Sequence, residues 1–196
     1  MAKQAHYNSA HHNASSTAPD PYNRPAFSFG DRLKRLVWGI CWGLFYRISP
    51  RPLFAWRAFL LRLFGATVGP GCKFYPASKI HAPWNLFCDE VVAVADGVDI
   101  YNPAPLRLGS HAILSQGAYI CGATHDFDDP AFPLLAYAME FGAYSWVCAR
   151  ACVAPGVNIG EGAVLGLASV ATKNLEPWTV YAGVPAVKVK ERKKIA

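Results

Sequence analysis

The residue of this chain with the clearest capacity for chemistry is His125, which precedes the last letter of the sequence SQGAYICGATHD. An imidazole whose pKa is about 6.5 is largely neutral at cellular pH and can accept a proton from a hydroxyl group. Three carboxylates follow it, Asp126, Asp128 and Asp129, which could fix the tautomer of the ring or hold a polar substrate. The pattern predicts a general base at His125, with a purely structural histidine as the alternative.

No metal site is predicted beside this histidine. His81 and His111 have no partner at the spacing that zinc ligands need, and the histidines of the N-terminus have no second set of ligands. The six cysteines form no Cys-x-x-Cys pair. We expect them to be small buried side chains in a reducing cytosol.

A repeat of six residues must position His125. Between Phe141 and Thr172 a large apolar residue opens nearly every hexad, at Phe141, Val147, Val153, Ile159 and Leu165, with Ala171 the weakest. Helices and strands have periods of about 3.6 and 2 residues, so neither explains a period of six. A triangular parallel β-helix does, because each flat side holds one short strand and each corner needs a tight turn.

The same period continues upstream of this stretch. It places large apolar residues at Val68, Phe74, Ile80, Leu86, Val92 and Val98, and after a slip at Leu108, Leu114 and Ile120. We interpret the slip, between Ala104 and Leu108, as a turn that is short by part of its length. The rhythm breaks again between Asp126 and Glu140, in a segment too long for a corner and too apolar for a solvated loop. Such insertions commonly form the binding face of a repeat protein.

The predicted organisation has four parts. Residues 1–27 have no periodicity and are expected to be a disordered leader. Residues 28–65 form a helical arm, residues 66–187 form the β-helix with an inserted loop at 126–140, and residues 188–196 form a basic tail. The fold class is therefore mainly β.

The helical arm is both basic and aromatic. Ser28 and Asp31 have the spacing of a helix cap, and Gly65 lies where a helix end favours a left-handed residue. Each apolar run has about a dozen residues, below the roughly 20 that cross a bilayer. Two interpretations stay open: the helices cover the open end or side of the coil, or residues 31–64 lie on a membrane surface.

The charges are unevenly spread along the chain. Residues 31–64 and the tail are basic, while residues 65–187 between them are net acidic. This distribution suits an anionic small molecule or a membrane surface and argues against a nucleic-acid partner. The first residues lack the apolar stretch of a signal peptide. We expect a cytoplasmic protein. If residues 31–64 lie on a membrane surface, the contact would be peripheral and at the inner face of the cytoplasmic membrane.

Several motifs together carry a family resemblance that spans about residues 28–190. They are SPRPLFAWRAFLLRLFGATVG, APWNL, SQGAYICGATHDFDDPAFPL and VAPGVNIGEGAVLGLASVATKNLEPWTVYAGVPA. The chain resembles hexapeptide-repeat acyltransferases of the branch with galactoside and maltose O-acetyltransferases, and more closely exopolysaccharide acetyltransferases of the colanic-acid type. The resemblance implies a left-handed parallel β-helix, a homotrimer, and acetyl-CoA bound in a groove between neighbouring coils, with no metal.

The resemblance also implies roles for individual residues. His125 matches the general base that activates a sugar hydroxyl for direct attack on the thioester, in a ternary complex. Asn102 and Asp126 are the candidates for acceptor binding. The candidates for contact with CoA are Trp146, Ala149, Leu167, Thr172, Lys173 and Lys190, the last standing where the family has arginine. The arm differs from that of the galactoside and maltose enzymes, so their sugar specificity is not transferred.

The sequence thus predicts an O-acetyltransferase that moves acetyl from acetyl-CoA to a sugar hydroxyl during assembly of an exopolysaccharide or related glycan. The alternative from another class is a β-helix without catalytic activity that serves as a scaffold or assembly protein. The two differ in whether the groove binds CoA.

Overall fold

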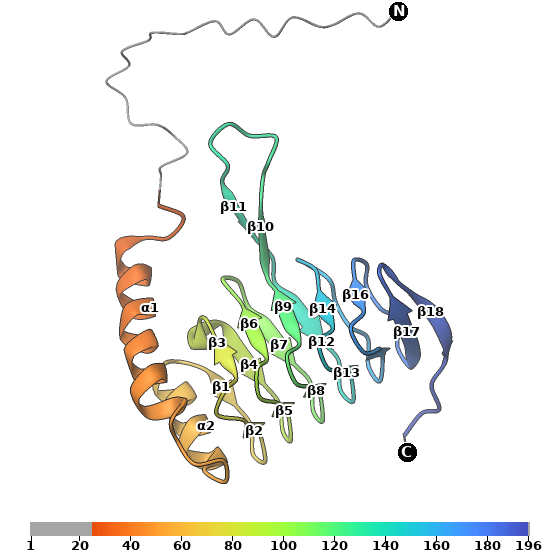
Figure 1. Cartoon of the computed structure of the whole chain (residues 1–196), viewed down its shortest axis with the longest axis horizontal. Coiled ribbons are helices and arrows are strands. Elements are labelled where there is room, and N and C mark those ends of the chain that lie inside the picture. The colour runs from red at the N-terminus through yellow and green to blue at the C-terminus, as the bar shows by residue number, and fades with distance from the viewer. Residues whose placement is uncertain (1–24, 196) are drawn as a thin grey trace, which may run out of the picture.

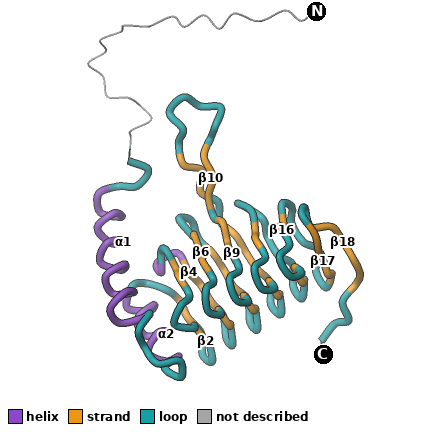
Figure 2. The backbone as a smooth tube through the Cα atoms, viewed as in Figure 1, coloured by secondary structure: helices purple, strands orange, loops and turns teal. Residues whose placement is uncertain are grey.

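A computed structural model describes residues 25–195, and in it the chain forms a triangular parallel β-helix with helices packed at its N-terminal end (Figure 1). The short strands alternate with loops at the three corners of each turn (Figure 2). Strands of successive turns pair in register and build three faces. The predicted fold class, a parallel β-helix with a helical N-terminal arm, is confirmed.

Each face takes one strand from most turns. Face I holds β1 (Thr67–Val68), β4 (Leu86–Cys88), β7 (Leu106–Leu108) and β12 (Met139–Phe141). Face II holds β2 (Lys73–Phe74), β5 (Ala93–Val94), β8 (Ile113–Leu114), β13 (Trp146–Val147), β15 (Val164–Leu165), β17 (Thr179–Gly183) and β18 (Ala186–Glu191). Face III holds β3 (Lys79–Ile80), β6 (Asp99–Tyr101), β9 (Tyr119–Cys121), β14 (Cys152–Val153) and β16 (Val170–Ala171). The pairing is parallel throughout these faces, except that β18 runs antiparallel to β17.

The core consists of columns of apolar side chains that stack from turn to turn. On face II the register aligns Phe74, Val94, Leu114, Val147, Leu165 and Tyr181, all of them buried. Successive side chains of a strand point to opposite sides, so one residue of each short strand enters the core and its neighbour faces out. The hexads opened by Phe141, Val147 and Val153 are therefore read in the correct phase.

The prediction of a shortened turn between Ala104 and Leu108 is wrong, because the first turns of the coil are longer than the later ones. Strand pairing aligns Thr67 with Phe87 and Phe87 with Arg107, so the first turns are longer by two residues than the later turn that aligns Trp146 with Val164. The extra residues enter at the corner between faces III and I, where Pro83–Asn85 forms a turn of 3₁₀-helix. The slip is therefore an insertion, not a shortening.

This insertion shifts the strand positions that follow it. Val92 and Val98 lie at corners, and Val94 and Ile100 occupy the inward strand positions two residues later. All four side chains are buried. Because these corner residues are apolar too, the period of six continues unbroken in the sequence. The residues that it marks, however, change from strand positions to corner positions.

The arm closes the N-terminal end of the coil. It consists of α1 (Phe29–Cys41), a π-helical segment (Trp42–Tyr46) and α2 (Phe54–Leu63). The indole N–H groups of Trp38 and Trp42 donate to backbone oxygens of face III, at 2.6 Å and 2.9 Å. Ser28 accepts the backbone N–H of Asp31, as the cap spacing predicted. The inner side of the arm therefore covers the coil, as the first interpretation of the arm required.

Arg57 fastens the arm to the first turn. Its fully buried guanidinium donates to the carbonyl oxygens of Phe74 (2.5 Å), Pro50 (3.0 Å) and Arg51 (2.6 Å), and to the hydroxyl of Ser49 (2.7 Å). Burial lowers the pKa of this arginine from its ordinary value. Hydrogen bonds offset the cost of burying the charge, because each carbonyl oxygen offers a partial negative charge.

We expect Arg57→Met to destabilise the protein by about 3 kcal/mol or more, because the substitution leaves several buried carbonyl oxygens without a donor. Scanning calorimetry should record a melting temperature lower by roughly 6 to 12 °C. Arg32→Met, at an exposed position of the same arm, is the matched control and should melt within about 2 °C of the unmodified protein. Equal melting of the two variants would contradict the role of Arg57.

Candidate functional site

His125 lies at the root of a hairpin that leaves the coil. The hairpin consists of β10 (Ala123–His125) and β11 (Leu134–Ala136), which pair antiparallel. It occupies the corner between faces III and I, after β9 and before β12, and projects beyond the coil in Figure 1. The segment predicted as an inserted loop is thus ordered in part as two strands, and a rigid coil holds its base.

A single hydrogen bond sets the protonation pattern of the His125 ring. Its Nδ1 lies 2.9 Å from the carbonyl oxygen of Phe132, across the hairpin. A carbonyl oxygen only accepts, so Nδ1 carries the proton in the neutral ring. The Nε2 atom is then left with a lone pair, which is the requirement for a general base. The Phe132 ring stacks on the imidazole, with centroids 4.5 Å apart and planes at 11°.

The carboxylates that follow His125 shape the hairpin instead of holding the ring. Asp126 accepts the backbone N–H of Asp128 at 3.1 Å, and Asp129 accepts that of Ala131 at 2.8 Å. These are Asx turns, in which a side chain replaces a backbone acceptor. The tautomer is therefore set by the carbonyl of Phe132 and not by a carboxylate, which corrects one of the two roles considered for these aspartates.

Phe132 was not among the residues singled out from the sequence. Its contribution to the tautomer comes from the backbone, which has no signature in the residue type. Its φ of 46° places it in the left-handed region, uncommon for a residue other than glycine. The two Asx turns before it, in DFDDPAF, were the available signal that this segment folds back on itself.

Asn102 lies at the same corner as the hairpin, one turn earlier. Its side chain accepts the backbone N–H of Ala82 at 3.0 Å and donates to the carbonyl of the same residue at 2.8 Å. Only 2% of Asn102 is exposed. Asn85 reinforces the corner by donating to the carbonyl of Pro103 at 2.7 Å. The structure thus gives Asn102 a structural role, and its role in acceptor binding stays a prediction.

Trp146 faces outward from β13 on face II. Its ring is 41% exposed, and its N–H donates to the hydroxyl of Ser115 at 2.8 Å, one turn earlier. Ala149 and Leu167 lie at the corner between faces II and III, where the carbonyl of Ala149 accepts the N–H of Ala168 at 3.0 Å. Leu167 is 71% exposed. An outward indole, held by the hydroxyl that accepts its N–H, and the exposed corner backbone form a surface suited to an extended ligand.

The predicted basic contacts lie toward the C-terminal end of the coil. Thr172 and Lys173 are exposed at the corner between faces III and I, and Lys190 is exposed on β18. Lys188 is held by two carboxylates, Glu191 at 2.6 Å and Glu176 at 3.2 Å. Hydrogen bonds to Glu191 and then Glu176 raise the pKa of Lys188 to about 12. Lys188 is thus already paired, whereas Lys190 makes no such pair among the described residues.

The predicted site residues are divided between two sides of the coil. His125 and Asn102 lie at the edge where faces III and I meet, and Trp146 lies on face II. In a triangular prism that edge is opposite face II. One chain therefore does not bring the indole of Trp146 and the imidazole of His125 to the same surface.

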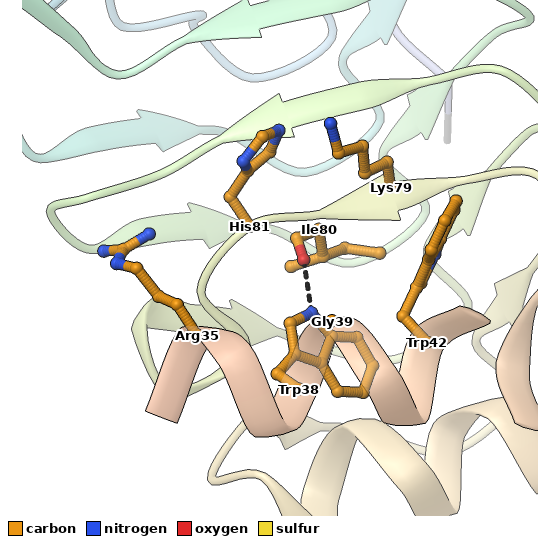
Figure 3. A pocket seen from close by; sticks show the side chains of 7 residues that line it. All are labelled: Arg35, Trp38, Gly39, Trp42, Lys79, Ile80 and His81. Atoms are coloured by element: carbon orange, nitrogen blue, oxygen red, sulfur yellow. Dashed lines mark hydrogen bonds between the residues drawn. The ribbon is translucent and has the colours of Figure 1, made fainter. Parts of the chain in front are cut away.

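A separate hollow of about 230 Å³ lies between α1 and face III. Figure 3 shows Arg35 and Trp42 on one side of it and Lys79 and His81 on the other. Its basic side chains already have partners, since Arg35 lies 2.7 Å from Asp31, and His81 and Lys79 lie 2.8 Å and 4.0 Å from Asp99. These pairs leave little free positive charge for an anionic ligand.

No cluster of three or more potential metal ligands occurs within residues 25–195. All six cysteines are free in the structure, and none pairs with another.

The fold is a hexapeptide β-helix with a histidine at the root of an inserted hairpin. No protein-family model matches the chain. It is 37% identical over 166 residues to the provisionally named colanic acid biosynthesis acetyltransferase WcaF of Escherichia coli (strain K12), covering 85% of this chain and 91% of that protein. The chain belongs to the hexapeptide-repeat acetyltransferases. This relationship confirms the predicted family and enzyme class.

Solved structures support the same fold at low identity. A hexapeptide-repeat acetyltransferase of Vibrio cholerae, complexed with acetyl coenzyme A, superposes with a TM-score of 0.78 at 20% identity, covering 87% of this chain and 93% of its own. A galactoside acetyltransferase in complex with coenzyme A gives 0.77 at 21% identity, covering 84% of each chain.

The tautomer of His125 is open to direct measurement. We expect long-range ¹H–¹⁵N spectra at pH 8 to show a protonated Nδ1 and an unprotonated Nε2 for this residue, because the Phe132 carbonyl accepts from Nδ1. The signal is assigned by its absence in His125→Ala. A ring protonated on Nε2 would show that the hairpin does not hold the histidine in this way.

Proposed function

We propose that this protein transfers acetyl from acetyl-CoA to a sugar hydroxyl in the assembly of an exopolysaccharide or related glycan, with His125 as the general base. The observation that carries the proposal is the hydrogen bond from His125 Nδ1 to the Phe132 carbonyl, which leaves Nε2 able to accept a proton. Family membership supports the reaction class, and the name of the E. coli relative supports the glycan. Membership of an acetyltransferase family argues against the alternative of a scaffold without catalytic activity.

The proposed reaction is a direct transfer in a ternary complex. Nε2 of His125 takes the hydroxyl proton as the sugar oxygen forms a bond to the thioester carbonyl carbon. The carbon–sulfur bond then breaks, and the departing sulfur takes the proton from the imidazolium to give the CoA thiol. Backbone N–H groups stabilise the negative charge on the carbonyl oxygen of the tetrahedral intermediate. The imidazole is neutral again at the end of the reaction, because the proton that it took from the hydroxyl has passed to the sulfur of CoA. This route requires neither a metal nor an acyl-enzyme.

The donor site in this proposal runs along the coil. Trp146 contacts the pantetheine arm, Ala149 and Leu167 offer backbone groups, and Lys190 lies near phosphate. Thr172 and Lys173 lie on the edge that carries His125, so in this proposal they reach the donor from a neighbouring chain. The neighbours solved with acetyl-CoA or CoA support an extended donor on this fold. A lysine neutralises phosphate as a point charge, without the paired hydrogen bonds of arginine.

The active unit in this proposal is a homotrimer. His125 and Trp146 lie on opposite sides of one coil, so a site that uses both must take them from adjacent chains. A closed ring of three coils meets this requirement at every interface. Each groove between neighbouring chains then holds one donor.

The acceptor lies near the hairpin in this proposal. Asp126 is half-buried beside His125, and the hairpin and the arm flank the corner at which Asn102 sits. The acceptor hydroxyl must reach Nε2 within hydrogen-bond distance for the proton to move. In this proposal Asp126 helps to position the sugar around that hydroxyl, and Asn102 contributes by holding the corner through its hydrogen bonds to Ala82.

We expect His125→Ala to lower the turnover of acetyl-CoA by at least about 100-fold, because the substitution removes the group that accepts the hydroxyl proton. Release of the CoA thiol, followed with a thiol reagent against a panel of sugars and glycolipids, measures this. His111→Gln alters a histidine outside the proposed site and is the matched control. Undiminished turnover in His125→Ala, with the fold intact by circular dichroism, would refute the assignment of the base.

The division of the site between chains predicts complementation. His125→Ala and Trp146→Ala should each have low activity alone, whereas mixed trimers from co-expression should regain about a quarter of the unmodified sites. Each restored site combines His125 of one variant with Trp146 of the other. Trimers are verified by light scattering. No recovery in mixed trimers would mean that one chain supplies both residues, or that Trp146 is not part of the site.

A further inference from the structure

The arm presents an apolar surface to the outside of the molecule. Its members, defined here as the outer arm face, are Phe29, Leu33, Leu36, Val37, Ile40 and Leu44 from the first helical stretch and Trp56, Phe59 and Leu63 from α2. Leu36 is 61% exposed, Leu63 is 66% exposed and Phe29 is 80% exposed. A contiguous apolar surface of this kind marks a contact with a partner or a membrane.

The first helical stretch differs from an ordinary surface helix, because its inner side is aromatic and its outer side is aliphatic. An ordinary surface helix buries its aliphatic stripe and exposes its polar side. Here the buried side carries Trp38 and Trp42, whose indoles donate to the coil. The aliphatic stripe, with Leu33, Leu36 and Ile40, points away from the coil. Contact with the coil therefore does not explain why this stripe is apolar.

The apolar sides of the two helices border one shared hollow. This hollow of about 630 Å³ is lined by residues of both, including Leu33 and Val37 of α1 and Leu63 of α2. Trp84, from the first turn of the coil, also lines the hollow. Trp56 and Phe59 extend the surface along α2, their rings stacked with centroids 5.8 Å apart. The outer arm face is thus one surface and not two isolated stripes.

Positive charge surrounds this surface. Arg32 and Lys34 are exposed on α1, and at 100° per residue they fall on opposite flanks of its aliphatic stripe. Arg47, Arg51 and Arg62 are exposed elsewhere in the arm. The single acidic residue of positions 31–64, Asp31, is paired with Arg35 at 2.7 Å. Cations that flank an apolar helix face, with long stems lying along it, are the pattern of a helix at an anionic lipid interface.

We propose that the outer arm face docks the protein on a membrane surface that contains anionic lipids. The apolar side chains enter the boundary between headgroups and acyl chains, while Arg32 and Lys34 reach the lipid phosphates on either flank. No helix in residues 25–195 is long and apolar enough to cross a membrane. The excess of positive charge favours this occupant over a second copy of the arm, because two such surfaces would repel each other.

The docking is independent of the proposed acetyl transfer. In the proposed trimer, the three arms lie at the same end of parallel coils, so all three outer arm faces meet one membrane together. Three linked contacts bind more tightly than one, because the second and third are intramolecular. This gain rests on the trimer, whereas the docking of each arm does not.

The test is sedimentation of the full chain with vesicles. We expect about 10-fold more protein to sediment with vesicles of phosphatidylcholine and phosphatidylglycerol (about 7 to 3) than with phosphatidylcholine alone, in low salt. Leu36→Glu with Ile40→Glu should lower this binding at least about 10-fold, because it places charge within the apolar stripe. Arg32→Gln with Lys34→Gln should lower binding to the anionic vesicles alone.

The matched control is Val187→Glu with Val189→Glu, which adds the same charge at exposed apolar positions of β18. It should sediment like the unmodified chain. Circular dichroism melting verifies that each variant is folded. The proposal is overturned if the unmodified chain stays in solution with anionic vesicles, or if the arm variant binds as the control does. It is also overturned if the arm variant changes only the oligomer size seen by light scattering, since the arm then contacts another copy.

Discussion

The structure depends on the in-register stacking of one turn of the coil on the next. Each inward side chain lies on its equivalent in the turns before and after it, as Leu114 lies between Val94 and Val147. Any change in the length of a turn must therefore be absorbed at a corner, because a shift within a strand would turn its core residue outward. The first turns absorb two residues at the corner between faces III and I, and the third absorbs an entire hairpin there. The apolar columns also end abruptly at the first turn, so the coil needs a cover, which the arm supplies.

This constraint explains why His125 stands where it does. The hairpin leaves at the corner between faces III and I, directly after a turn whose corner Asn102 and Asn85 hold by hydrogen bonds, so its root has an ordered base. Beyond that root the hairpin supplies contacts of its own. The Phe132 carbonyl and ring do so from the opposite strand. The imidazole of His125 is thus positioned by the coil and oriented by the insertion.

The sequence identifies the core residues correctly where the period of six coincides with the inward strand positions. The hexads from Phe141 to Ala171 identify the inward columns because no other element has a period of six. They misplace Val92 and Val98, because corners accept apolar residues as readily as strands do. Two further features have no signal in residue type: a backbone carbonyl as the partner of His125, and a buried guanidinium at Arg57 in a helix pattern that suggests a solvated charge. From the sequence, the arm could either cover the coil or lie on a membrane, because its inner and outer sides are both apolar or aromatic. The structure shows that the inner side covers the coil, and it shows no contact for the outer side within the described residues.

The rigidity of the columns has a consequence for catalysis. A β-helix does not bend to bring its opposite sides together, so residues such as His125 and Trp146 keep their separation within a chain. A reaction that needs an imidazole and an extended donor on one surface then depends on how chains pack. The same rigidity makes the packing reproducible, because parallel flat faces can meet in few ways. A site shared between chains would then take its precision from the repeat itself.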